Sequence, residues 1–186
     1  MTIKPLILAL LLMMAAGCAA IQKAYVQPDS APTKTTNDAA GSPVSHSQNV
    51  NRGEILAAHD KYRREVGVPA LVWSDSVAAS ARQWADHLAA TRSFMHSASG
   101  YGENIWAGTT GSFSQTDMVN RWGSEKQNFV PGGPFPNVCR GRCGHYTQII
   151  WRDTSVIGCG LASDGARDYL VCQYDPPGNY RGRKPY

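Results

Sequence analysis

The chain has 186 residues, of which 42% are hydrophobic and 17% charged, and its formal net charge at pH 7 is +4. This length suits one ordinary domain with terminal extensions, and the hydrophobic content is sufficient for a packed core. Basic residues are interleaved with acidic ones apart from a short tail at 181–184. Since no nucleic-acid-binding motif is present, we expect no nucleic-acid partner.

The N-terminus has the features of an export signal. Lys4 precedes an apolar run over 6–14, which is too short to span a bilayer comfortably, and small residues lead to Cys18. This ending resembles a bacterial lipobox, which predicts a signal peptide over 1–17 and lipidation of Cys18. Acyl chains such as palmitate would then hold the protein to a membrane of the cell envelope. The alternative is an ordinary secretory signal with an incidental cysteine.

A linker and one globular domain are predicted after the signal. Residues 18–47 are rich in Ala, Pro, Thr, Ser, Asn and Gln and lack hydrophobic periodicity, which is typical of a disordered linker. Residues 48–186 are the size of one domain, which we expect to be monomeric.

Four cysteines remain once Cys18 is set aside, an even number that suits disulfide formation in an exported chain. Three pairings are possible. Spacing favours Cys139 with Cys143, around a small loop, and Cys159 with Cys172, across a hairpin turn. The competing interpretation is a zinc site made of four thiolates, which an oxidising compartment disfavours.

Helical periodicity marks the first half of the domain. Asn51 and Ser74 are placed to cap two helices, and a third, shorter helix starts near Ser114. Their inner faces carry these side chains: Ile55, His59, Tyr62 and Val66 in the first, Val77, Ala81, Trp84 and Leu88 in the second, Met118, Trp122 and Glu125 in the third. His59 and Glu125 are ionisable side chains on otherwise apolar faces. Because a buried ionisable group needs a partner, we expect each of them to contact another polar group.

Aromatic and β-branched segments mark the second half. Strands are predicted at 101–106, 146–151, 156–162 and 169–174, separated by turn residues. Because the helices come early and most strands late, the pattern favours an α+β domain with helices packed on an antiparallel sheet. The Gly- and Pro-rich stretch 131–143 is predicted to be a long surface loop.

Four segments resemble signatures of the CAP superfamily, which groups cysteine-rich secretory, antigen 5 and pathogenesis-related 1 proteins around an SCP-like domain. They are HDKYR at 59–63, GENI at 102–105, GHYTQIIW at 144–151 and YLVCQYDPPGNY at 169–180. Asp60 stands where the family usually has Asn. The resemblance covers residues 48–186 and implies a three-layer α-β-α sandwich with a central antiparallel sheet. It also implies that two further cysteines of plant members were lost together as a bonded pair, which agrees with the favoured pairing.

The resemblance also implies a site. Family members place two His and two Glu in a central cleft, and the matching positions here are His59, Glu103, Glu125 and His145. Such a set could bind Zn²⁺ or another divalent cation, directly or through water. The alternative is a hydrogen-bonded polar cluster that orders the core without metal. His96, beside a loop, is expected only to brace this site.

The favoured function is an extracytoplasmic binding module rather than an enzyme. Family members bind sterols, fatty acids or other lipids, and some engage host or cell-surface proteins, so a lipid, sterol-like or envelope-protein partner is implied. Phe129, Val130 and Phe135 are candidates for a ligand-binding loop, with a disulfide-clipped connector as the alternative. A metal-dependent, peptidase-like hydrolase with Glu125 or Glu103 as the base is the second hypothesis. A structural envelope domain is the third.

Overall fold

The computed structural model describes residues 46–186. The predicted signal peptide, Cys18 and nearly all of the predicted linker lie outside this range. No helix within the described range is long and apolar enough to cross a membrane. The first strand, β1 (His46–Gln48), includes the last two residues of the segment predicted as linker.

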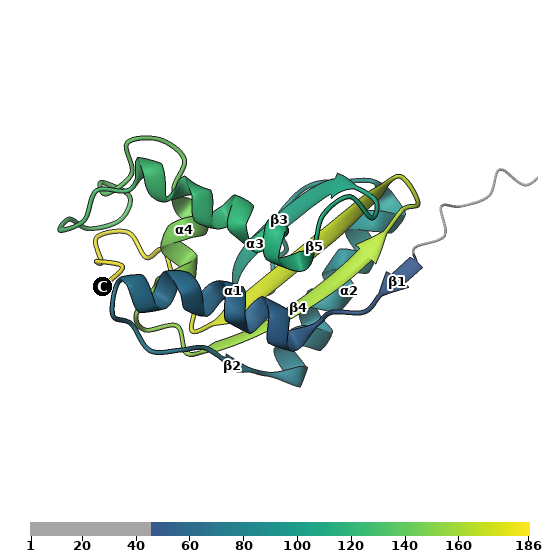
Figure 1. Cartoon of the computed structure of the whole chain (residues 1–186), viewed down its shortest axis with the longest axis horizontal. Helices are drawn as coiled ribbons and strands as arrows, with labels where there is room; N and C mark the ends of the chain where they lie inside the picture. Colours follow the sequence, from purple (N-terminus) through teal and green to yellow (C-terminus); the bar gives the residue numbers. More distant parts are fainter. Residues whose placement is uncertain (1–45) are drawn as a thin grey trace, which may run out of the picture. The chain divides into compact units, whose positions relative to one another are not determined.

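A mixed sheet forms the middle layer (Figure 1). Its other strands are β2 (Val72–Trp73), β3 (Gly102–Thr109), β4 (Val156–Ser163) and β5 (Arg167–Asp175). The order is β1-β4-β5-β3, all antiparallel, and β2 pairs with β4 in parallel. The long strands β3, β4 and β5 confirm the predicted strands near 101–106, 156–162 and 169–174.

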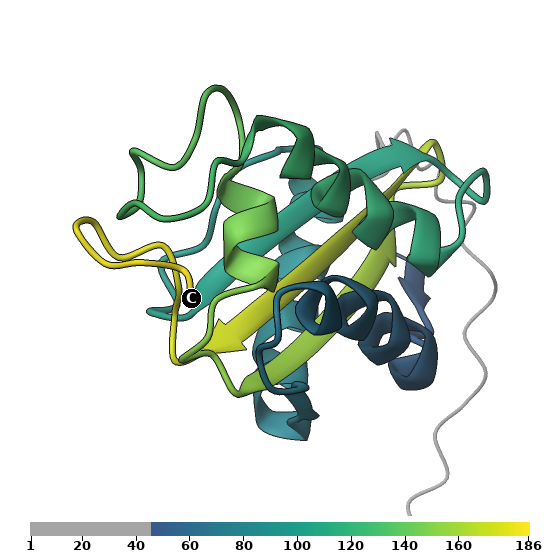
Figure 2. The same cartoon turned by 60° about the vertical axis from the view of Figure 1, so that its left-hand side comes forward.

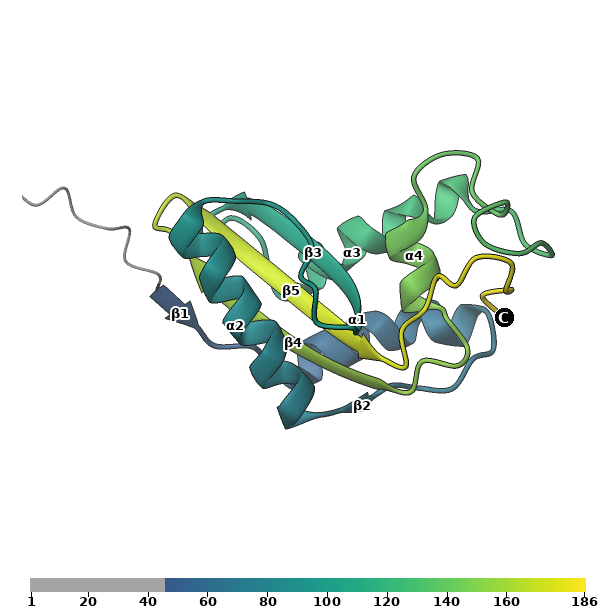
Figure 3. The same ribbon diagram turned by 180° about the vertical axis from the view of Figure 1, so that it is seen from behind.

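Helices cover both faces of this sheet. They are α1 (Arg52–Glu65), α2 (Asp75–Thr91), α3 (Gln115–Gly123), the 3₁₀ helix η1 (Ser124–Asn128) and α4 (Gly144–Ile149). Figure 2 shows α1, α3 and α4 on one side of the sheet, and Figure 3 shows α2 on the other. This is the α-β-α sandwich that the family resemblance implies.

Two apolar clusters hold the layers together. The larger cluster joins α1, α3 and α4 to the sheet, and the smaller one joins α2 to β3, β4 and β5. Helix α2 lies very close to β4, and Gly158 and Gly160 permit this approach. A Cβ atom at either position would overlap the backbone of α2 at Ala78 or Arg82. Asn51 and Ser74 cap α1 and α2 as predicted, each accepting a hydrogen bond from the backbone three residues on.

Both favoured disulfides are present in the described part of the chain. Cys139 is bonded to Cys143, and Cys159 is bonded to Cys172. Cys159 and Cys172 are direct partners in the register of β4 and β5, so this bridge crosses the hairpin as predicted. The thiolate zinc interpretation is therefore wrong.

The segment 146–151 is not a strand. It belongs largely to α4, whose first turn is closed by a hydrogen bond from Thr147 N to Cys143 O, 2.9 Å. All six residues are buried, so the segment shows no alternation of buried and exposed positions with a helical period. Periodicity alone cannot distinguish such a short buried helix from a buried strand. The third predicted helix is also shorter than expected, since it ends at Gly123 and Glu125 lies on η1.

Candidate ligand-binding cleft

An open cleft of about 410 Å³ lies between the start of β3 and the start of α4. Its lining comes from four parts of the chain: Phe94, Met95 and His96; Glu103, Asn104 and Ile105; Arg142, Gly144 and His145; and Asn179. A smaller hollow of about 210 Å³ shares Phe94, Ile105, Arg142 and His145 with it and adds Glu125. We call these two adjoining spaces the cleft.

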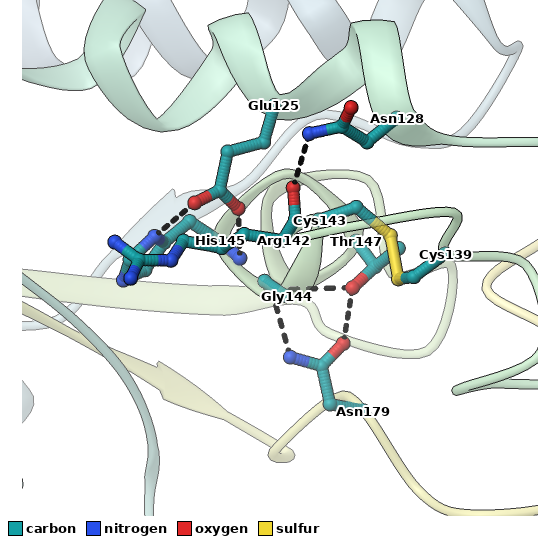
Figure 4. Close-up of a disulfide and its surroundings, with 9 residues drawn as sticks. All are labelled: Glu125, Asn128, Cys139, Arg142, Cys143, Gly144, His145, Thr147 and Asn179. Carbon is teal, nitrogen blue, oxygen red and sulfur yellow. Dashed lines mark hydrogen bonds and ion pairs between the residues drawn. A yellow bond between two sulfur atoms is a disulfide. The ribbon is translucent and has the colours of Figure 1, made fainter.

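Two histidine–carboxylate pairs lie in the cleft. His96 Nδ1 is 2.8 Å from Glu103 Oε1, and His145 Nδ1 is 2.8 Å from Glu125 Oε1. Glu125 Oε2 also accepts a hydrogen bond from the backbone N–H of His145, at 2.9 Å (Figure 4). The carboxylate therefore fixes both the backbone and the imidazole ring of His145. In both histidines, Nε2 has no hydrogen-bond partner among residues 46–186. Each ring is therefore oriented through one nitrogen and has the other available.

The first turn of α4 is fixed from several sides, which positions His145. The Cys139–Cys143 disulfide closes the preceding loop, and Asn128 Nδ2 donates to Arg142 O at 2.9 Å (Figure 4). Gly144 O accepts from Asn179 Nδ2 at 2.8 Å, which joins the second long signature to the first. These contacts fix the position of His145 relative to the rest of the domain.

Glu103 is fixed by hydrogen bonds from three residues. Its carboxylate accepts from His96, from Ser97 N at 2.9 Å and Ser97 Oγ at 2.6 Å, and from Gln173 Nε2 at 3.0 Å. Burial alone would raise the pKa of Glu103, but these hydrogen bonds outweigh it and the net pKa is lowered. The hydrogen bond to Glu103 raises the pKa of His96, against the opposing effect of its burial.

Glu125 is held ionised in the same way. Burial would raise its pKa, and the hydrogen bonds and charge of His145 lower it overall. A general base works best with a pKa near the working pH, and a general acid must hold a proton there. The lowered pKa values of Glu103 and Glu125 therefore count against both as catalytic groups in the hydrolase hypothesis.

His59 does not reach the cleft, contrary to the expectation from the resemblance. It is fully buried on α1, where Nδ1 is 2.8 Å from Ile55 O and Nε2 is 2.9 Å from Tyr174 Oη. Both ring nitrogens are thus engaged inside the core. Burial is also the main cause that lowers the pKa of His59 to about 4. His96, which was expected only to brace the site, provides the second imidazole of the cleft.

The three candidate loop residues line neither part of the cleft. Phe129 packs against Tyr146 and Tyr186, with ring centroids 5.3 and 5.9 Å apart. Val130 N donates to Val138 O at 2.7 Å, and the backbone of Phe135 pairs with the C-terminal segment. These contacts are those of a connector that is packed on the core.

Asn104 and Tyr174 support the cleft and were missed from the sequence. Asn104 Nδ2 donates to His145 O at 3.1 Å and to Tyr174 Oη at 3.2 Å, so it links the cleft to the buried His59–Tyr174 pair. Both residues stand inside signature segments, but their partners are distant in sequence. Asn104 comes directly after Glu103 and points to the α1 side, as strand alternation requires.

The layered fold, the two disulfides and the cleft with its histidine–carboxylate pairs define an SCP-like domain of the exported type. The chain belongs to the CAP family: residues 56–174 match the model of the cysteine-rich secretory protein family. It is 42% identical over 149 residues to pathogenesis-related protein 1A of Nicotiana tabacum, covering 77% of this chain and 86% of the tobacco protein. It is 39% identical over 134 residues to pathogenesis-related protein 1 of Arabidopsis thaliana, covering 72% and 81%.

Solved structures show the same fold. The crystal structure of NaASP2 with Zn²⁺ matches with a TM-score of 0.64 at 23% identity, over 73% of this chain and 84% of NaASP2. BmVAL-1 matches with a TM-score of 0.63 at 25% identity, over 73% and 81%. Family membership and the disulfides together indicate an extracellular location for the domain.

Proposed function

We propose that this protein is a lipid-anchored binding module of the cell envelope, and that the cleft holds the ligand. The observation that carries the proposal is the composition of the cleft edge, where Phe94 and Met95 are 57% and 56% exposed beside two available imidazoles. Contiguous exposed apolar surface at the edge of a cleft is typical of ligand-binding grooves. The anchor would be Cys18, which lies outside the described residues.

The cleft suits an amphipathic lipid. Phe94, Met95 and Ile105 offer an apolar surface, while Arg142 and His145 lie close by in the same lining. Arg142 is exposed and forms no ion pair within residues 46–186, so it is free to meet an acidic or polar headgroup. A fatty acid combines these two features, and a sterol-like molecule is the alternative with a smaller polar end. An apolar lining with a few convergent polar groups is typical of small-molecule sites.

Exchanging Phe94 for Asp should weaken binding of a fluorescent fatty acid about tenfold or more, because burial of an aromatic side chain contributes about 1.5–3 kcal/mol. The matched control is Val72→Asp, since Val72 is 66% exposed on β2 and lies outside the cleft lining. Fluorescence titration of both variants beside the unchanged protein measures the difference. Equal affinities for all three proteins would exclude the cleft as the lipid site.

A divalent cation is a second occupant that we propose for the same cleft. The donors that fit are Nε2 of His96 and of His145, and each ring is hydrogen-bonded to a carboxylate through its other nitrogen, as ligating histidines generally are. No group of three or more His, Cys, Asp or Glu side chains within residues 46–186 is placed to hold a metal. Structural zinc sites use four protein ligands, so we expect a weak, open site completed by water. The solved relative NaASP2 contains Zn²⁺.

Zinc affinity should fall when either imidazole is removed. We expect His96→Ala and His145→Ala to abolish detectable Zn²⁺ binding, and Glu103→Gln to weaken it about 10–100-fold through loss of ring orientation. His87→Ala is the control, because His87 lies outside the cleft. Calorimetric titration at several pH values should also show weaker binding as the pH falls through the raised pKa of His96, since a proton then competes with the metal. Binding that survives both histidine variants would exclude this site.

A further inference from the structure

A second pocket, of about 290 Å³, lies on the opposite side of the sheet from α1. It is bounded by the outer surface of α2, by the segment 97–99 and by the end of β5; Figure 3 shows the α2 face. It shares no lining residue with either part of the cleft. It is therefore a distinct pocket that adjoins the cleft through the hydrogen bonds of Ser97 and Gln173 to Glu103, and the ligand proposed for it does not depend on the function proposed for the cleft.

The lining of this pocket carries no Asp, Glu, Lys or Arg. Its apolar part is the Trp84 indole, which stacks on the exposed His87 ring with centroids 4.6 Å apart and planes 16° apart. The Trp84 indole is held in place by a hydrogen bond from Nε1 to Met95 O, 3.0 Å. The rest of the lining is hydroxyl and amide groups apart from Ala98. An aromatic platform with neutral donors and acceptors around it fits a ligand that is uncharged, ring-shaped and rich in hydroxyl groups.

We propose that this pocket binds a neutral saccharide. A sugar ring has an apolar C–H face, which packs against aromatic rings, and a rim of hydroxyls that both donate and accept hydrogen bonds. Hydroxyl and amide side chains match such a rim because they too can donate and accept. A charged glycan would find no counter-ion in the lining.

Several polar groups in the pocket are available to a ligand. Within residues 46–186, Gln83 and Ser80 on α2 have no side-chain hydrogen-bond partner. Ser99 Oγ lies 2.9 Å from Ser97 Oγ, whose own hydrogen goes to Glu103, and it accepts from Gln173 Nε2 at 3.2 Å. These groups would supply both donors and acceptors.

Gln173 provides an independent observation, because its side chain carries a buried hydrogen-bond acceptor without a donor in the described part of the chain. Its side chain is fully buried at the base of the pocket, and its Oε1 has no partner among the described residues. The amide orientation is fixed because Nε2 must donate to Glu103 Oε2, 3.0 Å away. A buried acceptor without a donor is destabilising, so a hydroxyl group that reached Gln173 Oε1 would be stabilised there.

The test is an NMR titration of the disulfide-bonded protein with two neutral tetrasaccharides, chitotetraose and maltotetraose, and with an anionic heparin tetrasaccharide. We expect at least one neutral sugar to shift the Trp84 indole N–H and the backbone amides of Ser97 and Ser99, and to leave the His145 amide unchanged. The anionic sugar should not do so. Shifts confined to the cleft, a preference for heparin, or no shift with either neutral sugar would overturn the proposal.

Variants sharpen this test without disturbing the core. Gln83→Ala and His87→Ala change exposed positions, and each should weaken binding of the neutral sugar about tenfold. The matched control is Gln127→Ala, an exposed glutamine on η1 outside the pocket, which should bind as the unchanged protein does. Unchanged affinity in both pocket variants would show that the sugar binds elsewhere.

Discussion

Replacing Arg63 with Met is expected to lower the free energy of unfolding by about 3–5 kcal/mol, a large part of the stability of an ordinary domain. The Arg63 side chain is fully buried and donates to four carbonyl oxygens: Pro69 at 2.6 Å, Ile149 at 2.8 Å, and Trp151 and Thr154 at 3.0 Å. These carbonyls come from the segment after α1, from the last residue of α4 and from the turn that follows α4. One guanidinium therefore ties two distant segments together.

Methionine has a similar volume but no donor, so the variant would leave four buried acceptors without partners. Each such group costs about 1–3 kcal/mol unless the structure shifts to let in water. Burial lowers the pKa of Arg63 to about 10, which still leaves it charged at neutral pH, and its hydrogen bonds are accordingly of the stronger, charge-assisted kind. Lysine at this position would keep the charge but could not reach four carbonyls with one planar fork.

The neighbouring Arg64 provides the control. It is exposed on the same helix and forms one ion pair with Asp60, at 3.6 Å. Because exposed pairs of this kind contribute about 0–1 kcal/mol, Arg64→Met should leave stability nearly unchanged. Denaturant unfolding of both variants measures the contrast. Similar losses in the two proteins would show that the buried network does not stabilise the fold as described.

The elements with strong local signals were predicted correctly. Asn51 and Ser74 mark the starts of α1 and α2, because a cap followed by a periodic apolar face is a property of the local chain. The long strands β4 and β5 follow from their composition and the turn between them. By contrast, β2 has only two residues and exists through its pairing with β4, a contact that no local pattern reveals.

The candidate site was predicted in part, and the error has a physical reason. Periodicity correctly placed His59 on the inner face of α1. However, a residue on the inner face of a helix can be buried in the core as well as line a cleft. The fully buried His59 finds partners in Ile55 and Tyr174, so it has nothing left for a ligand. His96 lies in an aperiodic segment, and only the packing of that segment on Glu103 brings it to the cleft. Such contacts depend on the whole fold.

Lowering the pH from 7 to 4 is expected to destabilise the protein by about 3 kcal/mol through His59 alone. In the unfolded chain this imidazole takes up a proton near its ordinary pKa of 6.5, whereas burial in the folded state lowers the pKa to about 4. Between these two values the unfolded state binds more protons, so stability falls as the pH falls. The loss begins near pH 6.5 and levels off below about pH 4.

Other groups affect this window differently and can be separated. The raised pKa of His96 stabilises the folded state at low pH, an effect that is lost as the pH rises through that pKa, so it opposes the effect of His59. The lowered pKa values of Glu103 and Glu125 give stability that is lost only as the pH falls below the ordinary carboxyl value of 4.5. The slope between pH 6.5 and 4.5 therefore reports mainly on the two histidines, and His96→Gln removes the opposing one.

Denaturant unfolding at a series of pH values, with the His59→Gln variant beside the unchanged protein, tests this assignment. Glutamine does not titrate and can still offer a hydrogen bond to Tyr174, so the variant should lose some stability at pH 7 and most of the slope between pH 6.5 and 4.5. A matched change at the exposed His87, His87→Gln, should leave the slope as it is. A slope that persists in His59→Gln would mean that another group causes it and that folding does not lower the pKa of His59 as described.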